Sequence, residues 1–84
     1  MTRTVGTHPG MQRWTTSLDG GRLRALRRQH GLSQERLATH AGISLTTVRR
    51  LEVQPAAPCR SRTLGRLARA LGEDPAYLAP AMPP

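Results

Sequence analysis

The spacing of small and apolar residues around Gly42 constrains the fold more than any other feature. Counted from Gln34, such residues fall at positions 4, 5, 8, 10, 15 and 18, which is helical spacing on both sides of the glycine. They are Leu37, Ala38, Ala41, Ile43, Val48 and Leu51. Gly42 suits a turn that needs a positive φ, because it has no Cβ to clash there. The pattern predicts two short helices that cross at the small Ala38 and are joined by a tight turn.

Capping residues place the helices before and within this pair. Asp19 is a candidate N-cap for a first helix over about residues 20–30. Ser33 and Ser44 are candidate N-caps for the next two helices, because a serine oxygen accepts a free backbone N–H of the first turn. The second of these helices runs to about Glu52.

Prolines and glycines organise the remainder. Residues 53–60 contain two prolines within four positions, which predicts a loop. Ser61 or Arg62 begins a fourth helix that Gly72 closes, and Asp74-Pro75 begins a short last one. No segment alternates as a strand does. The predicted fold is therefore all-α, a compact five-helix bundle.

The chain is expected to contain one folded domain, over residues 19–79. Residues 1–18 lack any period and predict a flexible arm, and residues 80–84 a C-terminal tail. No apolar run approaches the ~18 residues that span a bilayer, and the start of the chain lacks the apolar region of a secretory signal. Cys59 is single, which excludes an internal disulfide framework. We expect a cytoplasmic protein without a membrane partner.

The charge is strongly positive. Thirteen basic residues, all arginine, face five acidic ones, which gives a net charge of +8. A dense positive field favours a polyanionic partner, and nucleic acid is the commonest. A GC-rich genome would explain the missing lysines but not the shortage of acidic residues.

Several motifs together resemble one known family. They are the Leu-Ser-Gln at 32–34, the Leu-Ala pair at 37–38, the Ala-Gly-Ile at 41–43, Glu52, and the Leu-Ala-Arg-Ala-Leu-Gly at 67–72. Over about residues 19–79 the chain resembles the helix-turn-helix family of Cro and phage-type repressors, the XRE family. The resemblance implies a lambda-repressor-like fold and binding of double-stranded DNA.

The leading interpretation is a bacterial or phage transcriptional regulator, a nucleoid-associated repressor that binds a palindromic operator as a dimer. The resemblance places the dimer surface around Tyr77 and Leu78. One alternative is an antitoxin or adaptor whose main partner is a protein and whose DNA binding serves autoregulation. Another is non-specific binding of nucleic acid or RNA through arginine alone.

In this fold the third helix, over residues 44–52, enters the major groove by its N-terminal end. Because its other side is apolar, the outward stripe comprises Leu45, Thr46, Arg49 and Arg50. Either arginine suits a bidentate bond to guanine. Leu45 suits a thymine methyl, and Thr46 offers both a methyl and a hydroxyl. These four are the predicted base contacts.

Five further residues are candidate phosphate contacts. The resemblance matches Gln34 to a position that meets the DNA backbone, and Arg60 and Arg62 to basic residues that meet the next phosphates. Ser44 and Thr47 lie at the edge of the predicted recognition helix, where either could bond a phosphate or cap the helix. Gln34 could also be an ordinary exposed first-turn residue.

The resemblance also pairs Arg27 with Glu52, as an ion pair that fixes the recognition helix.

We expect no enzyme activity, because the sequence shows no nucleophile–base set, paired carboxylates or phosphate loop. The three histidines lack metal-ligand spacing, so no metal or cofactor is expected.

Overall fold

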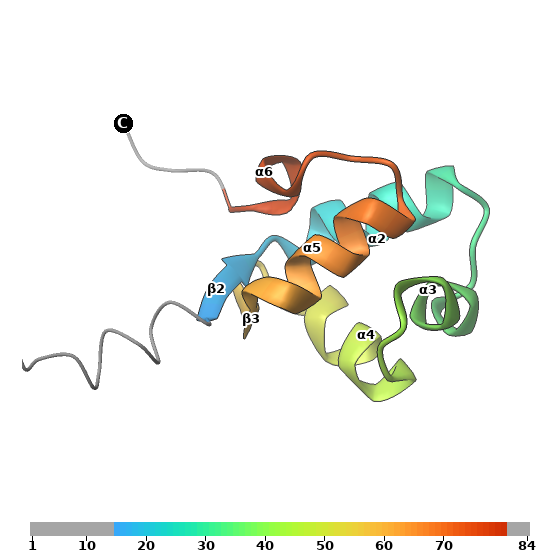
Figure 1. The fold of residues 1–84 in the computed structure, drawn as a ribbon, viewed down its shortest axis with the longest axis horizontal. Helices are drawn as coiled ribbons and strands as arrows, with labels where there is room; N and C mark the ends of the chain where they lie inside the picture. Colours follow the sequence, from blue (N-terminus) through green and yellow to red (C-terminus); the bar gives the residue numbers. More distant parts are fainter. Residues whose placement is uncertain (1–14, 81–84) are drawn as a thin grey trace, which may run out of the picture.

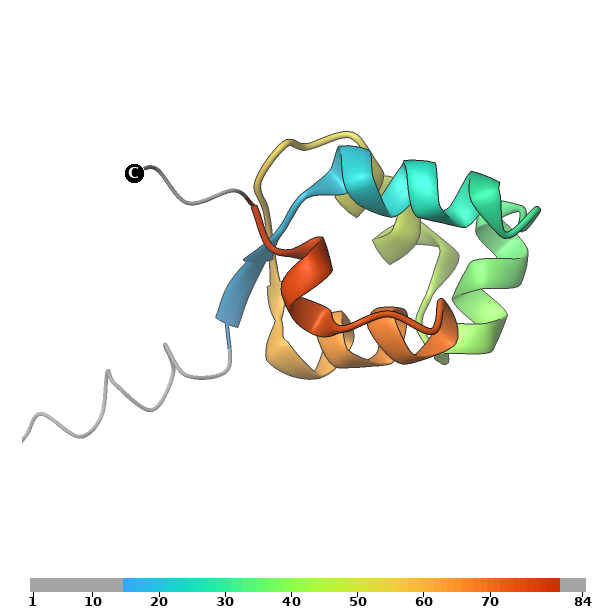
Figure 2. The same ribbon diagram turned by 90° about the horizontal axis from the view of Figure 1, so that it is seen from above.

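A computed structural model describes residues 15–80 (Figure 1). Its elements are β2 (Thr15–Leu18), α2 (Gly20–Gln29), α3 (Gln34–Ala41), α4 (Leu45–Glu52), β3 (Ala57–Arg60), α5 (Ser61–Ala70) and α6 (Pro75–Leu78). Within these residues the fold is mostly helical, with five helices and one small sheet. The sheet and α3 lie at opposite ends of the molecule, and α2 and α5 lie along opposite sides (Figure 2).

Side-chain caps begin four of the five described helices. Asp19, Ser33 and Ser44 accept the backbone N–H of the residue three positions on, as the sequence predicts, and Asp74 accepts that of Ala76. Each such bond satisfies a donor that has no partner within its helix. The predicted helix bounds therefore agree with the structure to within one or two residues.

Leucine is the main residue of the core, with alanine filling the closer contacts. The largest fully buried side chains are Leu18, Leu23, Leu37, Val48, Leu51, Leu67, Leu71 and Leu78. Burying one such side chain contributes about 1.5–3 kcal/mol, so a chain without phenylalanine can still assemble a core. These residues come from β2 and from all five described helices, which makes them one structural unit.

The sheet is the feature that sequence analysis missed. β2 pairs antiparallel with β3, with Thr15 opposite Arg60 and Leu18 opposite Ala57. The all-α prediction is wrong here, because the end of the predicted arm forms β2 and half of the predicted loop 53–60 forms β3. Leu18, Ala57 and Cys59 are buried, but four residues are too few to show a strand period. The rest of the predicted arm, residues 1–14, and most of the tail, residues 81–84, lie outside the described residues.

A backbone crossing joins the start of α2 to the end of α4. The N–H of Gly20 donates to the carbonyl oxygen of Gln54 at 2.9 Å. A Cβ on Gly20 would collide with that oxygen and with the carbonyl oxygen of Leu51. Only glycine permits this approach, which brings α2 alongside α4. None of the described helices has the length and apolarity needed to cross a membrane.

Candidate nucleic-acid interface

Helices α3 and α4 form the two-helix unit that the sequence predicts. Gly42 lies between them in the left-handed conformation, with φ of 70°. The N–H of Ile43 donates to the carbonyl oxygen of Ala38 at 3.0 Å, which closes the turn. Ala38 is buried where the helices meet. These contacts fix the position of α4 relative to α3.

The exposed side of α4 carries three of the four predicted base contacts. Val48 and Leu51 are fully buried, while Thr46, Arg49 and Arg50 are exposed. The fourth predicted contact, Leu45, is half-buried and packs against the core. Its side chain is therefore shared between the core and the surface.

The two arginines of this stripe have different surroundings. Arg50 donates from Nη1 to the carbonyl oxygen of Pro58 at 3.0 Å, which ties α4 to β3. Arg49 has no hydrogen bond or ion pair with the described part of the chain. Arg49 is thus the less constrained of the two. The sequence carries no signal for this difference, because β3 itself was not predicted.

Ser44 and Thr47 are bonded to each other at the start of α4. The Ser44 hydroxyl oxygen accepts the N–H of Thr47 at 3.0 Å and lies 2.8 Å from the Thr47 hydroxyl oxygen. Of the two roles that sequence analysis left open, capping is present in this structure. Both hydroxyls retain hydrogen-bonding capacity.

Arg27 of α2 and Glu52 of α4 form a buried ion pair between the two helices. Arg27 donates from Nε and Nη2 to the two carboxylate oxygens of Glu52, at 2.6 and 3.0 Å. The side chains are only 10% and 2% exposed. The hydrogen bond to Glu52 raises the pKa of Arg27, although desolvation acts in the opposite direction. The two residues that the resemblance pairs are therefore joined by a two-bond fork.

Gln34 extends this network to α3. Its side-chain nitrogen donates to Glu52 Oε1 at 3.0 Å. The sequence motifs did not indicate this bond, because the resemblance matches Gln34 to a phosphate contact and pairs Glu52 with Arg27 alone. Glu52 therefore accepts from side chains of both α2 and α3. The amide nitrogen of Gln34 is therefore held in place by the carboxylate.

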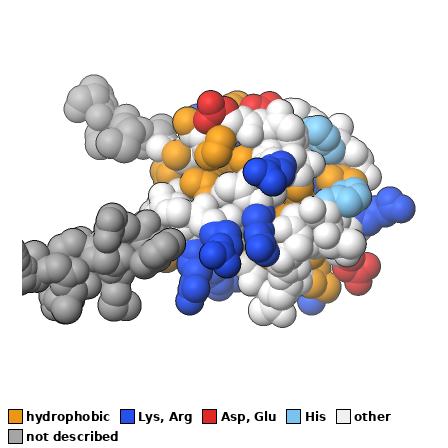
Figure 3. Space-filling view, in the orientation of Figure 1, with side chains coloured by type: hydrophobic (Ala, Val, Ile, Leu, Met, Phe, Trp, Pro, Cys, Tyr) orange, Lys and Arg blue, Asp and Glu red, His pale blue; other side chains and the backbone are white. Residues whose placement is uncertain are grey.

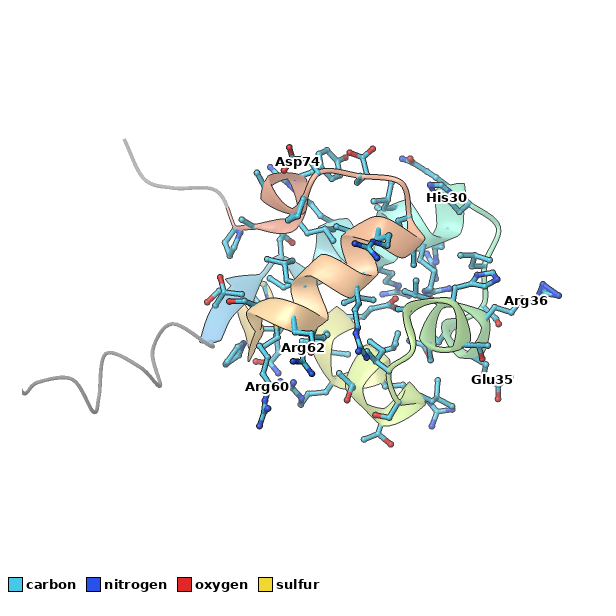
Figure 4. The ribbon with its side chains drawn as sticks, viewed as in Figure 1. His30, Glu35, Arg36, Arg60, Arg62 and Asp74 are labelled. Carbon is cyan, nitrogen blue, oxygen red and sulfur yellow. The ribbon has the colours of Figure 1, made fainter. Side chains whose placement is uncertain are left out.

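Arginines also stand at the junction of β3 and α5. Arg60 and Arg62 are exposed there and project from the molecule below α5, at the edge opposite Asp74 (Figure 4). Arginine side chains gather over α5 in the space-filling view (Figure 3). Arg66 of α5 donates to the carbonyl oxygen of Gly42 at 3.1 Å, which anchors α5 to the turn. That bond was not predicted from the sequence.

The structure also bears on two other kinds of site, a reactive cysteine and a metal centre. Cys59 is buried in β3, and burial raises the pKa of its thiol, with nearby Arg50 opposing the shift. Across residues 15–80 there is no group of three or more His, Cys, Asp or Glu side chains that could hold a metal ion.

Comparisons with known proteins identify the family. Residues 23–78 match the model of the helix-turn-helix family. A search of curated proteins found no match. Among solved structures, the chain is similar to the restriction-modification controller protein C.AhdI from Aeromonas hydrophila, with 36% identity and a TM-score of 0.63. The similarity covers 69% of this chain and 86% of that one. The family is one of regulators and not of enzymes, and this chain belongs to it as an XRE-type helix-turn-helix protein, a DNA-binding transcription regulator.

Proposed function

We propose that the protein represses transcription by inserting α4 into the major groove of a specific operator. The observation that carries this proposal is the outward face of α4. Thr46 and Arg49 are exposed there, and the arginine has no partner among the described residues. An α-helix fits the width of the major groove, where base edges differ between sequences, and a free arginine on its outward face can reach those edges.

Arg49 is the principal reader in this proposal. Its guanidinium can donate twice to O6 and N7 of guanine, a contact that discriminates by about 1–3 kcal/mol. Arg50 uses one of its five N–H groups on Pro58, so the others remain for a base or a phosphate. Thr46 and the exposed part of Leu45 would contact a thymine methyl.

The proposed phosphate contacts flank α4. Arg60 and Arg62 would meet one strand from the start of α5. Gln34 keeps one amide hydrogen and its first-turn backbone N–H for the other strand, while Ser44 and Thr47 would donate through their hydroxyls. Such contacts fix the register of the protein on DNA but carry no sequence information themselves.

The proposed active form is a dimer on a palindrome, with half-sites about 34 Å apart. Leu78 cannot contribute to the dimer surface as sequence analysis expected, because it is fully buried in its own protomer. Tyr77 is 44% exposed, although Arg22 lies over its ring. We therefore keep Tyr77 at the dimer surface. Sedimentation at micromolar concentration would show a dimer, and a monomer with and without DNA would refute this element.

A regulatory role is supported by the similarity to C.AhdI, which is a controller protein. In this proposal the present protein binds bacterial or phage DNA, so it acts in the cytoplasm at the nucleoid. A reporter gene placed behind the operator tests the sign of regulation. The reporter is expected to be silenced, and its activation would overturn the assignment as a repressor.

Selection of bound sequences from a random DNA pool tests the central claim. The wild-type protein is expected to enrich a palindrome. Arg49→Ala should lose preference at one base pair of each half-site, because its guanine contact is gone. Arg69→Ala is the matched control, since Arg69 is an exposed arginine of α5 and should leave the enriched motif unchanged. Failure of the wild-type protein to enrich any sequence would refute specific binding and favour a protein partner.

A further inference from the structure

A shallow groove runs along the exposed side of α5 to the start of α6. The residues that line it include Arg62, Gly65, Arg66, Arg69, Glu73 and Pro75. Ala68 at its floor is the only lining residue that is buried, so the groove is open to solvent along its length. Sites for small molecules are usually enclosed and mostly apolar. The groove along α5 instead suits an extended part of another macromolecule.

Three arginines make this groove positive. Arg62, Arg66 and Arg69 are four and three positions apart, so they share one face of α5 over about 10 Å. All three are exposed. Arg62 and Arg69 have no hydrogen bond or ion pair with residues 15–80, and Arg66 uses one of its N–H groups on the carbonyl oxygen of Gly42. Glu73 is the only acidic residue of the lining, so the groove favours an acidic ligand.

Gly65 opens the floor of the groove between these arginines. A glycine inside a helix is less stable than an alanine. Gly65 has no positive φ, and a Cβ on it would meet nothing within 4 Å. Neither backbone conformation nor close packing therefore requires glycine at this position. It lies three positions after Arg62 and four before Arg69, so any side chain there would stand between the two.

A second copy of this chain does not match the groove in charge. The chain has five acidic residues. Glu52 is buried in its ion pair, and Asp19 and Asp74 accept the N-cap bonds of their helices. Glu73 lines the groove itself. Glu35 alone remains to meet three arginines, so the acidic ligand belongs to a different molecule.

The lining also favours a polypeptide over DNA. The carboxylate of Glu73 would repel a continuous phosphate backbone, whereas a polypeptide has N–H groups that can donate to it. The groove ends at Pro75, the first residue of α6. Arg62 and Asp74, the neighbour of Pro75, lie at opposite edges of the molecule (Figure 4). The groove therefore leads away from the edge that carries the proposed phosphate contacts.

We propose that the groove along α5 binds an acidic segment of a partner protein. Carboxylates of that segment accept hydrogen bonds from Arg62, Arg66 and Arg69, as arginine clusters bind other acidic motifs. The backbone of the segment packs over Gly65, and one of its N–H groups donates to Glu73. The proposal does not rest on the proposed function, because it requires no DNA.

Selection from a random peptide pool displayed on phage tests the chemistry of the ligand. The full-length wild-type protein is expected to enrich peptides rich in aspartate and glutamate. The enriched peptide is then labelled and titrated with the protein, and fluorescence anisotropy gives its affinity. No DNA is present, because Arg62 is also a proposed phosphate contact. Failure to enrich acidic peptides would overturn the proposal.

Charge variants locate the peptide on the protein. Arg62→Gln and Arg69→Gln should each weaken binding about two- to fivefold, which is typical of exposed ion pairs. Arg24→Gln and Arg28→Gln are the matched controls, because they remove the same charge from exposed arginines of α2. At physiological salt, charges more than about 8 Å apart are largely screened, so the controls should keep the wild-type affinity. Equal weakening by the two pairs would indicate attraction to net charge alone and refute the site.

Gly65→Leu tests the floor of the groove without changing its charge. The leucine side chain would fill the space between Arg62 and Arg69 and should abolish peptide binding. Leucine favours helix more than glycine does, and a Cβ at this position meets nothing, so thermal unfolding should show no loss of stability. Wild-type peptide affinity in this variant would be incompatible with the proposal.

Titrations with a short random-sequence duplex separate a protein partner from nucleic acid. Gly65→Leu and Arg69→Gln should bind the duplex as the wild type does, because neither residue is a proposed DNA contact. Lower DNA affinity in both variants would assign the groove to nucleic acid and overturn the proposal. Equal wild-type affinity for the selected operator and the random duplex refutes the proposed function alone, since the peptide titrations contain no DNA.

Discussion

The Arg27–Glu52 pair allows the sharpest test of how α4 is held. Glu52→Gln preserves the shape of the side chain but removes its charge and replaces one acceptor oxygen by a donor. Three N–H groups point at the carboxylate, two from Arg27 and one from Gln34. The variant leaves at least one of these donors facing another donor, and it leaves the arginine charge 90% buried without a counterion.

The expected loss follows from this burial. Removing one partner of a buried pair costs about 3–5 kcal/mol, a large share of the roughly 5–15 kcal/mol that stabilises a whole domain. For a domain of this size each kcal/mol shifts the Tm by about 4–8 °C. We therefore expect the Tm to fall by at least about 12 °C. The stability change has the same direction throughout the ordinary pH range. The hydrogen bond to Glu52 raises the pKa of Arg27 above its ordinary value, so its stabilising contribution is fully present in the ordinary pH range and is lost only in strongly alkaline solution.

Urea and thermal unfolding followed by circular dichroism measure the effect. Glu35→Gln is the matched control, because Glu35 is exposed and its side chain makes no hydrogen bond or ion pair with the described residues. Its free energy of unfolding should change by no more than about 0.5 kcal/mol. A double variant, Arg27→Met with Glu52→Leu, should be more stable than Glu52→Gln, since it leaves no charge buried. Full stability of Glu52→Gln would refute the reasoning.

Two other predictions concern packing and the buried thiol. Gly20→Ala should cost about 1–3 kcal/mol in urea unfolding, because its Cβ meets the carbonyl oxygen of Leu51, whereas Gly65→Ala, where a Cβ meets nothing within 4 Å, should stabilise α5 by about 1 kcal/mol. Equal effects of the two substitutions would contradict the close approach. Cys59 should react with a thiol reagent only as fast as the protein opens. Burial raises the pKa of the Cys59 thiol above 9.0, so the stability that the thiol contributes should be lost as pH rises through its folded-state pKa. Cys59→Ala should remove that pH dependence. Fast labelling of the native protein would contradict the burial of the thiol.

Local chemistry explains why the helices could be predicted from sequence. Asp19, Ser33 and Ser44 cap helices through bonds that span three residues, so the chain around each cap carries all the information needed. Gly42 likewise marks its turn through its own conformation. The Arg27–Glu52 pair spans 25 residues and was expected only because of the family resemblance.

The missed features all depend on contacts between separate elements of the fold. Leu18 lies in a four-residue strand, and its partner strand lies about 40 positions later. The bond from Arg50 to Pro58 exists only because β3 passes beside α4. Burial of Leu78 also follows from the packing of α6 on the rest of the fold. None of these contacts leaves a period or a motif in the sequence.

The two sides of α4 are held by bonds of different strength. On the α2 side, Glu52 is buried and accepts charge-assisted bonds from Arg27, which solvent scarcely weakens. On the β3 side, the bond from Arg50 to Pro58 is exposed and competes with water, so it stabilises the contact much less. Adjustment of α4 to a DNA duplex should therefore occur at β3 and the preceding loop. The α2 side of α4, which the buried pair holds, should change least.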